Sequence, residues 1–229
     1  MENYNLHIGK QFNFLKSMSE LEKKKLQESS SIQKIKKDEV IFYEEELLDH
    51  LYSICEGVCK FSFIDDKGKE HITKLLGKGD LMGRRSVITN KGALVTATAI
   101  TDTLLYYLDK KPVLQCLYKN NSFCQDVLKG FIDDMEDETE KNIYFQNHKK
   151  IKARLAGLLL YLGQKFGMEK KGWLKISLRR KEIADILGTT SEYIISLLTL
   201  FKDNNFISLH RRKIKINNNN ELVALMNSK

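Results

Sequence analysis

Hydrophobic residues between positions 40 and 108 fall in short runs that are typical of β-strands. Turn sequences separate these runs, and residues 65–68 (DDKG) and 77–80 (GKGD) are the clearest of them. The runs cover residues 40–43, 51–55, 58–64, 71–76, 94–100 and 103–108. Many short strands at near-regular spacing predict a β-roll or barrel.

The pattern becomes helical after Pro112, the only proline in the chain. Residues 122–150 contain no proline and a single glycine, which predicts one long helix. A heptad-spaced stripe on this helix favours a coiled-coil-like seam between two copies of the chain, in which a polar Asn helps to set the register. The stripe consists of Leu128, Phe131, Met135, Asn142 and Phe145. Glu138 falls on the same stripe, and packing of the helix on its own β domain is the alternative.

Residues 180–203 predict two helices joined by a tight turn. In the first helix, Ile183, Ile186 and Leu187 share one face, and Gly188 ends it where a left-handed backbone is needed. Thr189 and Glu192 fit a capping box that starts the second helix. The second helix has one stripe of apolar residues at the spacing of a buried face, namely Ile194, Leu197, Leu198 and Phe201.

The opposite face of the second helix carries short, mostly polar side chains that suit a helix lying in the major groove of DNA. They are Ser191, Glu192, Ile195, Ser196, Thr199 and Lys202. Residues 206–209 and 213–216 predict two strands around a basic turn of Arg211, Arg212 and Lys213. We expect this hairpin to be a wing whose cations lie along DNA phosphates.

Positive charge is concentrated at the same end of the chain. The whole chain has a formal net charge of +8, from 38 Lys and Arg against 30 Asp and Glu. Residues 151–229 hold 15 basic and 6 acidic residues, a net of +9, and the other 150 residues hold 23 and 24, a net of −1. A basic module joined to a neutral body is typical of a polyanion-binding protein, although a solvated basic surface is the alternative from charge alone.

Neither a membrane span nor a disulfide framework is expected. The longest apolar run, residues 155–162, is far shorter than the roughly 20 residues needed to cross a bilayer. Four cysteines without a framework spacing indicate reduced thiols. We therefore expect a cytoplasmic protein with no membrane partner.

Several residue blocks, in order along the chain, carry a family resemblance. The downstream blocks are Glu182-Ile183-Ala184, Leu187-Gly188, Ser191-Glu192, Leu197-Leu198 and Asn205-Phe206-Ile207-Ser208. The upstream blocks are Asp49-His50-Leu51-Tyr52, Glu56-Gly57-Val58, Gly68-Lys69-Glu70 and Gly79-Asp80-Leu81-Met82-Gly83. Over nearly its whole length the chain resembles the cyclic-AMP receptor protein and FNR (Crp/Fnr) family of bacterial transcription regulators.

The resemblance implies an α+β chain of three parts: a cyclic-nucleotide-binding-like β-roll (jelly-roll) effector domain over residues 1–120, a dimerisation helix over 121–150 and a winged helix-turn-helix over 151–229. It also implies a homodimer that binds double-stranded DNA at two-fold symmetric sites. RNA polymerase is then the expected protein partner, and the effector is left open.

Departures from the family pattern argue against cyclic AMP as that effector. The family's ribose-binding Glu follows the position of Gly83, where this chain has Arg84. Its phosphate-binding Arg falls at Ala93, and its base-contacting Thr-Ser pair falls at Thr139 and Glu140. Losing the Arg and adding a carboxylate disfavours an anionic nucleotide, so these five positions predict a degenerate pocket.

Other family features also differ. Iron-sulfur members use cysteines near the N-terminus, and the first cysteine here is Cys55. His71 and His148 are the candidates for haem ligands, and Cys116 and Cys124 for a thiol switch, but we predict no cofactor and no metal. The recognition helix has Ser191 and Ser196 at positions where Arg is common in the family, which predicts a different DNA site. Arg179 replaces a helix-capping Thr, which exchanges a cap for a phosphate contact, and Arg180 follows it.

Two functions from different classes remain on these residues. The first is a sequence-specific DNA-binding regulator, and the second is a sensor or scaffold whose winged helix no longer reads bases. An enzyme is disfavoured because the chain has no phosphate-cradling glycine loop, metal-spaced His/Cys cluster or nucleophile elbow.

Overall fold

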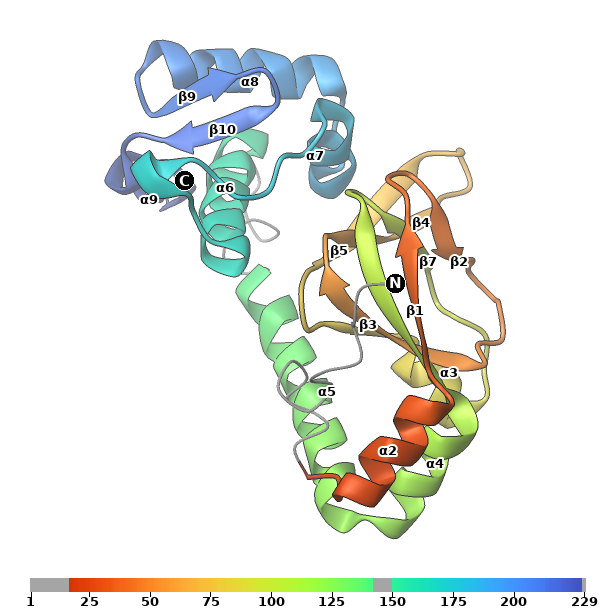
Figure 1. Cartoon of the computed structure of the whole chain (residues 1–229). Helices are drawn as coiled ribbons and strands as arrows, with labels where there is room; N and C mark the ends of the chain where they lie inside the picture. The colour runs from red at the N-terminus through yellow and green to blue at the C-terminus, as the bar shows by residue number, and fades with distance from the viewer. Residues whose placement is uncertain (1–16, 142–149, 228–229) are drawn as a thin grey trace. The chain divides into compact units, whose positions relative to one another are not determined.

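The computed structural model of the chain describes residues 17–141 and 150–227 (Figure 1). The chain divides into two compact units between Asp133 and Asp134, inside the long helix. This boundary differs from the expected division at residues 120 and 150, which stays a prediction. Each unit is described below by itself.

The first unit is built on two four-stranded antiparallel sheets. One sheet has the order β1-β8-β3-β6 and the other β2-β7-β4-β5. The strands are β1 (Ser31–Ile35), β2 (Val40–Phe42), β3 (His50–Glu56), β4 (Cys59–Ile64), β5 (Glu70–Leu76), β6 (Leu81–Met82), β7 (Thr96–Ala99) and β8 (Thr103–Asp109). All six predicted strands are present, with ends that differ by up to two residues. Two further strands, β1 and β6, were not predicted, because β1 exposes Lys34 and Gln33 at a sheet edge and β6 has two residues.

Small and branched apolar side chains fill the core of this unit. Cys59, Ala97 and Ala99 have no solvent exposure, and Ile54 and Leu105 are equally buried. Successive side chains along a strand point to opposite faces. Burial alternates in this way along β7, whereas β3 is buried on both faces from Leu51 to Cys55. This β-roll and the helices around it confirm the predicted α+β class.

Helices α2 (Glu20–Glu28), α3 (Arg84–Thr89), α4 (Lys110–Lys119) and α5 (Asn121–Lys141) accompany the sheets. The long helix α5 starts at Asn121, where the side chain of Asn120 accepts a hydrogen bond from the Phe123 amide at 3.0 Å. Phe123 itself is fully buried in the β-roll core. Asn142, Phe145 and His148 lie outside the described residues.

The second unit contains the end of α5 and a winged-helix arrangement (Figure 1). Its elements are α6 (Ile151–Phe166), the 3-10 turn η3 (Lys170–Gly172), α7 (Arg180–Leu187), α8 (Ser191–Asp203), β9 (Ile207–His210), β10 (Lys213–Ile216) and α9 (Asn219–Asn227). Helix α6 supplies the core of the unit and packs against α9. We did not predict α9, whose first residues are a polar asparagine run.

Among the described residues, no single helix is long and apolar enough to cross a membrane. Helices α7 and α8 reach that length and composition only when taken together across a bend of 103°. The apolar side chains of this pair, including Ile183, Leu187, Ile194 and Leu198, are buried within the second unit.

Phe123 is expected to be a main anchor of α5 in the β-roll. Phe123→Ala leaves a large cavity and should lower the free energy of unfolding by about 3–5 kcal/mol, as measured by urea titration. The matched control is Tyr118→Ala on α4, because Tyr118 is 83% exposed and should change stability by less than about 0.5 kcal/mol. A loss below about 1 kcal/mol for Phe123→Ala would contradict this role.

Candidate nucleic-acid interface and effector residues

The turn between α7 and α8 sets the direction of the second helix. Gly188 adopts a left-handed backbone with φ of 66°, and its amide donates to the Ala184 carbonyl. The Thr189 amide donates to the same carbonyl at 3.0 Å, so this residue still belongs to the end of α7. The helix cap therefore falls one residue later, where the Thr190 hydroxyl accepts from the Tyr193 amide at 3.3 Å. The predicted capping box from Thr189 to Glu192 is wrong for this reason.

Helix α8 separates its faces as predicted. Ile194, Leu197, Leu198 and Phe201 are buried. Glu192, Ile195, Ser196 and Thr199 are exposed, and Ser191 is partly exposed, so the predicted readout residues are accessible together. The structure adds Tyr193, which is 47% exposed beside this face. Its position one turn before Ser196 is the sequence signal that would have identified it.

Strands β9 and β10 form the predicted hairpin, with His210 paired to Lys213. The turn depends on Arg211, whose φ of 55° is in the left-handed region. Arg211, Arg212 and Lys213 are all exposed at this turn. Lys213 also lies 3.2 Å from the Glu169 carboxylate, an exposed ion pair of the kind that contributes little.

Arg180 ties the start of α7 to the wing. One of its terminal nitrogens, Nη2, donates to the Arg211 carbonyl at 3.3 Å. The other, Nη1, is buried with no hydrogen-bond partner among the described residues. Burial lowers the pKa of this guanidinium. The side chain therefore bridges two segments that both belong to the proposed DNA face.

Arg179 holds a buried carboxylate. Its Nε and Nη2 lie 2.9 and 2.8 Å from Oε1 of Glu182, which is only 3% exposed. The Arg179 amide donates to the other carboxylate oxygen at 2.6 Å. The Arg179 side chain itself makes no cap hydrogen bond, because a guanidinium has no acceptor. Arg179 thus gives up the cap as expected, and the phosphate contact stays a prediction.

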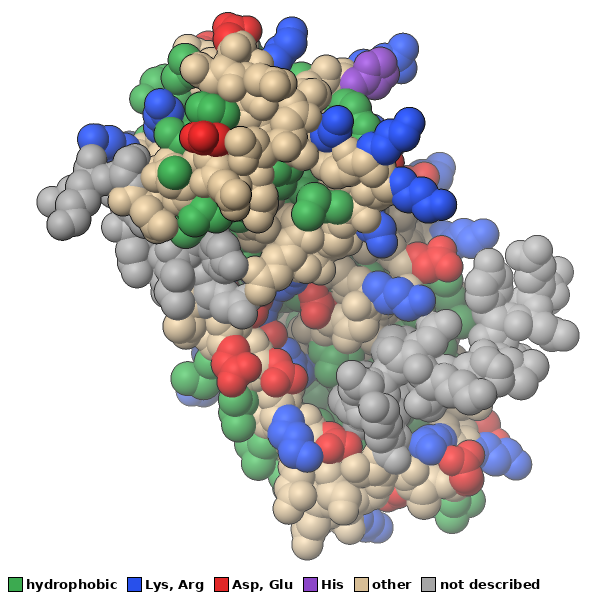
Figure 2. Space-filling model, turned by 90° about the vertical axis from the view of Figure 1, so that its left-hand side faces the viewer, with side chains coloured by type: hydrophobic (Ala, Val, Ile, Leu, Met, Phe, Trp, Pro, Cys, Tyr) green, Lys and Arg blue, Asp and Glu red, His purple; other side chains and the backbone are tan. Residues whose placement is uncertain are grey.

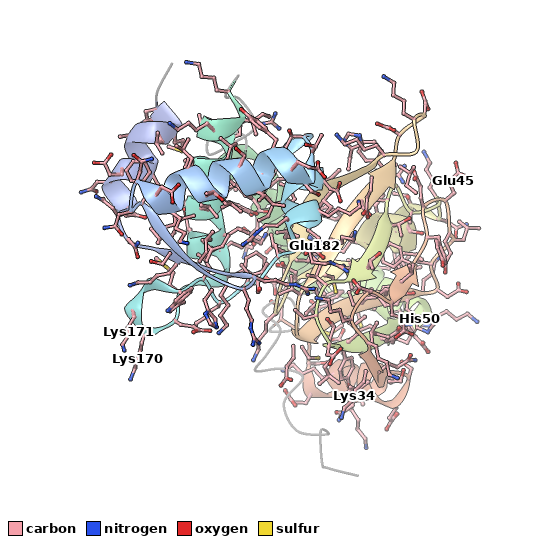
Figure 3. The ribbon with its side chains drawn as sticks, turned by 90° about the horizontal axis from the view of Figure 1, so that it is seen from above. Lys34, Glu45, His50, Lys170, Lys171 and Glu182 are labelled. Carbon is pink, nitrogen blue, oxygen red and sulfur yellow. The ribbon has the colours of Figure 1, made fainter. Side chains whose placement is uncertain are left out.

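Lys and Arg side chains gather along one edge of the part drawn at the top of Figure 2. Figure 3 shows Lys170 and Lys171 projecting from the turn of η3. This turn neighbours the wing, because a Cβ on Gly172 would lie 2.8 Å from the Ile216 carbonyl. The residues that follow this turn make isolated bridges: Trp173 pairs with Lys215, and Leu174 pairs with Met168.

In the first unit, the backbone around Ala93 is already paired. The Ala93 amide donates to the Glu46 carbonyl at 2.9 Å, and the Glu45 amide donates to the Ala93 carbonyl at 2.8 Å. Ala93 is buried, and the Arg85 guanidinium donates to the neighbouring Gly92 carbonyl. Position 93 itself therefore offers neither a cationic side chain nor a free backbone amide.

The other predicted effector residues fall into both units. Gly83 precedes α3 with φ of 85°, and the Arg84 guanidinium lies 5.0 Å from the centre of the Phe131 ring. Thr139 belongs to the second unit and donates its hydroxyl proton to the Met135 carbonyl at 2.9 Å. The Glu140 side chain lies outside the described part of the chain. A common pocket for all five residues stays a prediction.

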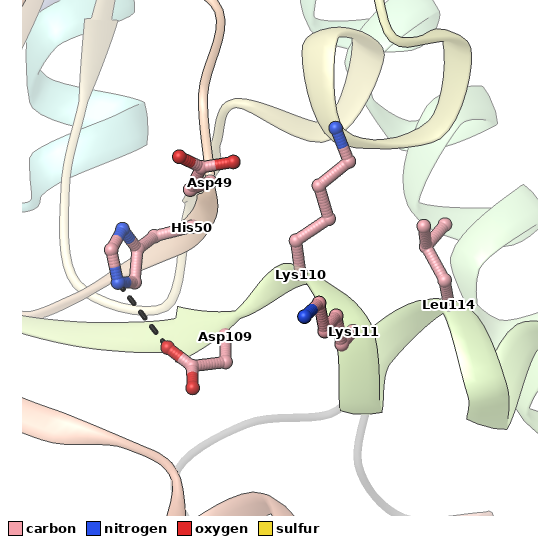
Figure 4. A pocket seen from close by; sticks show the side chains of 6 residues that line it. All are labelled: Asp49, His50, Asp109, Lys110, Lys111 and Leu114. Carbon is pink, nitrogen blue, oxygen red and sulfur yellow. Dashed lines mark ion pairs between the residues drawn. The ribbon is translucent and has the colours of Figure 1, made fainter.

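An open cavity of about 560 Å³ lies elsewhere in the first unit (Figure 4). Its lining residues are Asp49, His50, Asp109, Lys110, Lys111 and Leu114. His50 Nε2 lies 3.2 Å from an Asp109 oxygen, and Lys110 Nζ donates to the Asn90 side chain at 2.7 Å. None of the predicted effector residues lines this cavity.

Helix α5 exposes an apolar stripe. Leu128, Ile132 and Met135 are 56%, 54% and 70% exposed. Phe131, which was expected on the seam, is instead partly buried against the core of its own unit. Ile132 was missed because the heptad count placed Phe131 in that role.

Cys55, Cys59 and Cys116 are buried, and His71 contacts neighbouring side chains. Burial raises the pKa of Cys55 to about 11 and that of Cys59 to about 12, and also raises the pKa of Cys116. His71 lies 2.7 Å from the Asp65 carboxylate and stacks on Phe63. Within the ranges 17–141 and 150–227, no three His, Cys, Asp or Glu side chains are grouped as metal ligands.

Comparisons with known proteins agree with this arrangement. Residues 32–120 match the cyclic nucleotide-binding domain family and residues 153–225 match the Crp-like helix-turn-helix domain family. The CRP-like cAMP-activated global transcriptional regulator of Mycobacterium tuberculosis is 24% identical over 185 residues, covering 80% of this chain and 82% of the relative. The global nitrogen regulator of a Nostoc species is 25% identical over 189 residues, covering 81% and 84%.

Among solved structures, FixK2 from Bradyrhizobium japonicum is similar in fold. It superposes with a TM-score of 0.76 at 18% identity, covering 87% of this chain and 98% of FixK2. The β-roll, the long helix and the winged helix thus occur in the same order in both chains. With both domain families matched in that order, the chain belongs to the Crp/Fnr family of DNA-binding transcription regulators.

Proposed function

We propose that this regulator is a homodimer that binds double-stranded DNA sequence-specifically, at two-fold symmetric sites. The observation that carries the proposal is the pairing of an exposed polar face on α8 with the basic turn of the wing. Short polar side chains reach base edges in the major groove, while exposed cations bind phosphates without reading sequence. Both kinds of contact are needed for specific binding.

The apolar stripe of α5 supports the dimer. Leu128, Ile132 and Met135 recur at i, i+4 and i+7 and are more than half exposed. Burying such a stripe against a second copy removes apolar area from water and places two winged helices under one symmetry axis. A two-fold site on DNA then follows from a two-fold protein. RNA polymerase as protein partner and a cytoplasmic location follow from the same regulator role.

Cyclic AMP is not the effector in this proposal. Arg84 and Ala93 replace the residues that hold ribose and phosphate in members that bind the nucleotide, and the Ala93 backbone is paired with residues 45 and 46. One relative is named as cAMP-activated and another as a nitrogen regulator, so relatives at the same identity differ in their named roles. No cofactor is proposed.

The wing is expected to supply non-specific affinity. Replacing Arg211, Arg212 and Lys213 with Ala should weaken binding to every duplex alike and reduce the salt slope by about 1 for each lost phosphate contact. The measurement is fluorescence anisotropy over a range of salt concentrations. A matched control replaces Lys34, Lys36 and Lys37 of the first unit with Ala, which removes equal charge and should leave the slope unchanged. A loss confined to one sequence would contradict this assignment.

Glu192 is expected to read one base pair in each half-site. Its carboxylate is exposed near the start of α8, where it can accept from cytosine N4. Glu192→Ala should cost about 1–3 kcal/mol on the cognate site and relax the preference at one base pair, as measured by selection from random duplexes. Glu221→Ala on α9 is the control with the same charge change. Unchanged specificity would remove Glu192 from the readout and favour a winged helix that no longer reads bases.

Cyclic AMP is expected not to bind. An Ala cannot make the paired, charge-assisted hydrogen bonds that Arg makes with a cyclic phosphate, and that loss costs a few kcal/mol, or roughly a hundredfold in affinity. Titration calorimetry with cyclic AMP and cyclic GMP measures this directly. Micromolar binding of either nucleotide, with a matching gain in DNA affinity, would refute the proposal.

A further inference from the structure

Arg84 leaves the β-roll in the direction of α5. Strand β6 ends at Met82, and Gly83 turns the backbone through a left-handed conformation with φ of 85°. A side chain at this position would also meet Leu48 and the His50 carbonyl at 3.1 and 3.2 Å. The tight turn therefore fixes the backbone position of Arg84, which is the first residue of α3.

The Arg84 guanidinium lies on α5. Its Cζ atom is 5.0 Å from the centre of the Phe131 ring, within the range of a cation–π interaction. Phe131 is partly buried against the β-roll core, so the ring is a fixed surface. Both residues belong to the first unit.

Because Gly130 has no side chain, the Arg84 guanidinium can lie directly beside the backbone of α5. A Cβ at position 130 would lie 2.6 Å from Nη1 of Arg84 and 3.8 Å from its Cζ. The first distance is shorter than the closest approach normally seen between a Cβ atom and another heavy atom, so the guanidinium would have to move. Gly disfavours a helix interior more than any residue except Pro, and Gly130 is the only glycine in α5. A glycine at position 130 is explained if the Arg84 guanidinium has to lie against the backbone of α5, since any side chain there would collide with it.

We propose that Arg84 is a built-in tether that fastens α5 to the β-roll, so that the helix is held in its DNA-binding arrangement without a bound ligand. Gly130 is the matching feature of α5 that admits the tether. Arg84 is a positioning residue in this scheme, because it acts on DNA binding only through α5. The effect on DNA affinity rests on the proposed function, whereas the tether itself does not.

The last part of α5 makes hydrogen bonds within the second unit, so a shift of the helix at Arg84 would also reach the contacts of that unit. Asp137 accepts hydrogen bonds from the Tyr161 hydroxyl and from Lys165 Nζ, both at 2.8 Å. Tyr161 and Lys165 lie on α6, the core helix of the winged-helix unit. One continuous helix thus joins the Arg84 contact to the unit that binds DNA.

A double-mutant cycle without DNA tests the tether. Thermal unfolding is followed for the full chain, for Arg84→Ala, for Gly130→Ala and for the double variant. In the Arg84→Ala background, Gly130→Ala should raise Tm by about 2–4 °C, the usual gain of Ala over Gly in a helix. In the wild-type background the new Cβ displaces the guanidinium, so Tm should stay level or fall. An equal rise in both backgrounds would overturn the tether, whatever the chain does to DNA.

DNA affinity without added ligand tests the consequence. The probe is a duplex selected by the chain from a random pool. Arg84→Ala and Gly130→Ala should each weaken binding by on the order of tenfold, and the double variant no further. Arg85→Ala is the matched control, since this neighbouring Arg bonds the Gly92 carbonyl rather than α5, and it should retain wild-type affinity. Wild-type affinity in both Gly130→Ala and Arg84→Ala would overturn the coupling even if the Tm cycle holds. Failure of the wild-type chain to select any duplex would instead count against the proposed function.

Discussion

The structure depends on α5 being one uninterrupted helix that belongs to both units. Its hydrogen bonds run from Asn121 to Lys141, and the division between units falls inside it at Asp133. Phe123 anchors its first turn in the β-roll, and Asp137 holds its other end to α6. A helix transmits displacement along its axis because each turn is bonded to the next. Helix α5 contributes side chains to the packing of both units.

Charged side chains of the winged helix fall into two groups, those that make contacts inside the fold and those that are exposed to solvent. Arg179 and Arg180 are used inside the fold, one on the buried Glu182 carboxylate and the other on the wing turn. Arg212 and its neighbours on that turn remain exposed. A buried carboxylate without its partner would be costly, so the Arg179 contact stabilises the start of α7. Within the described part of the chain, the exposed cations of the wing make no such internal contact with a buried carboxylate and remain open to solvent.

The β-roll retains the family's architecture while its chemistry has changed. Where a nucleotide phosphate would need an Arg, Ala93 is buried and its backbone is paired. Where the ribose would need a carboxylate, Arg84 extends to Phe131 and Gly130. Arg84 and Phe131 thus form a cation–π contact between the β-roll and α5 within the first unit.

Local patterns in the sequence determined the six strands, the turn at Gly188, the buried and exposed faces of α8 and the basic wing. These features depend on periodicity, on a single left-handed residue and on neighbouring charges, all of which act within a few residues. Only the tertiary structure decided that the α8 cap is Thr190, that Glu182 holds Arg179, that Phe131 packs inward while Ile132 is exposed, and that Arg84 meets Gly130. These contacts join long side chains to distant segments or depend on competition between adjacent caps, and sequence spacing does not encode where a flexible side chain finds its lowest free energy.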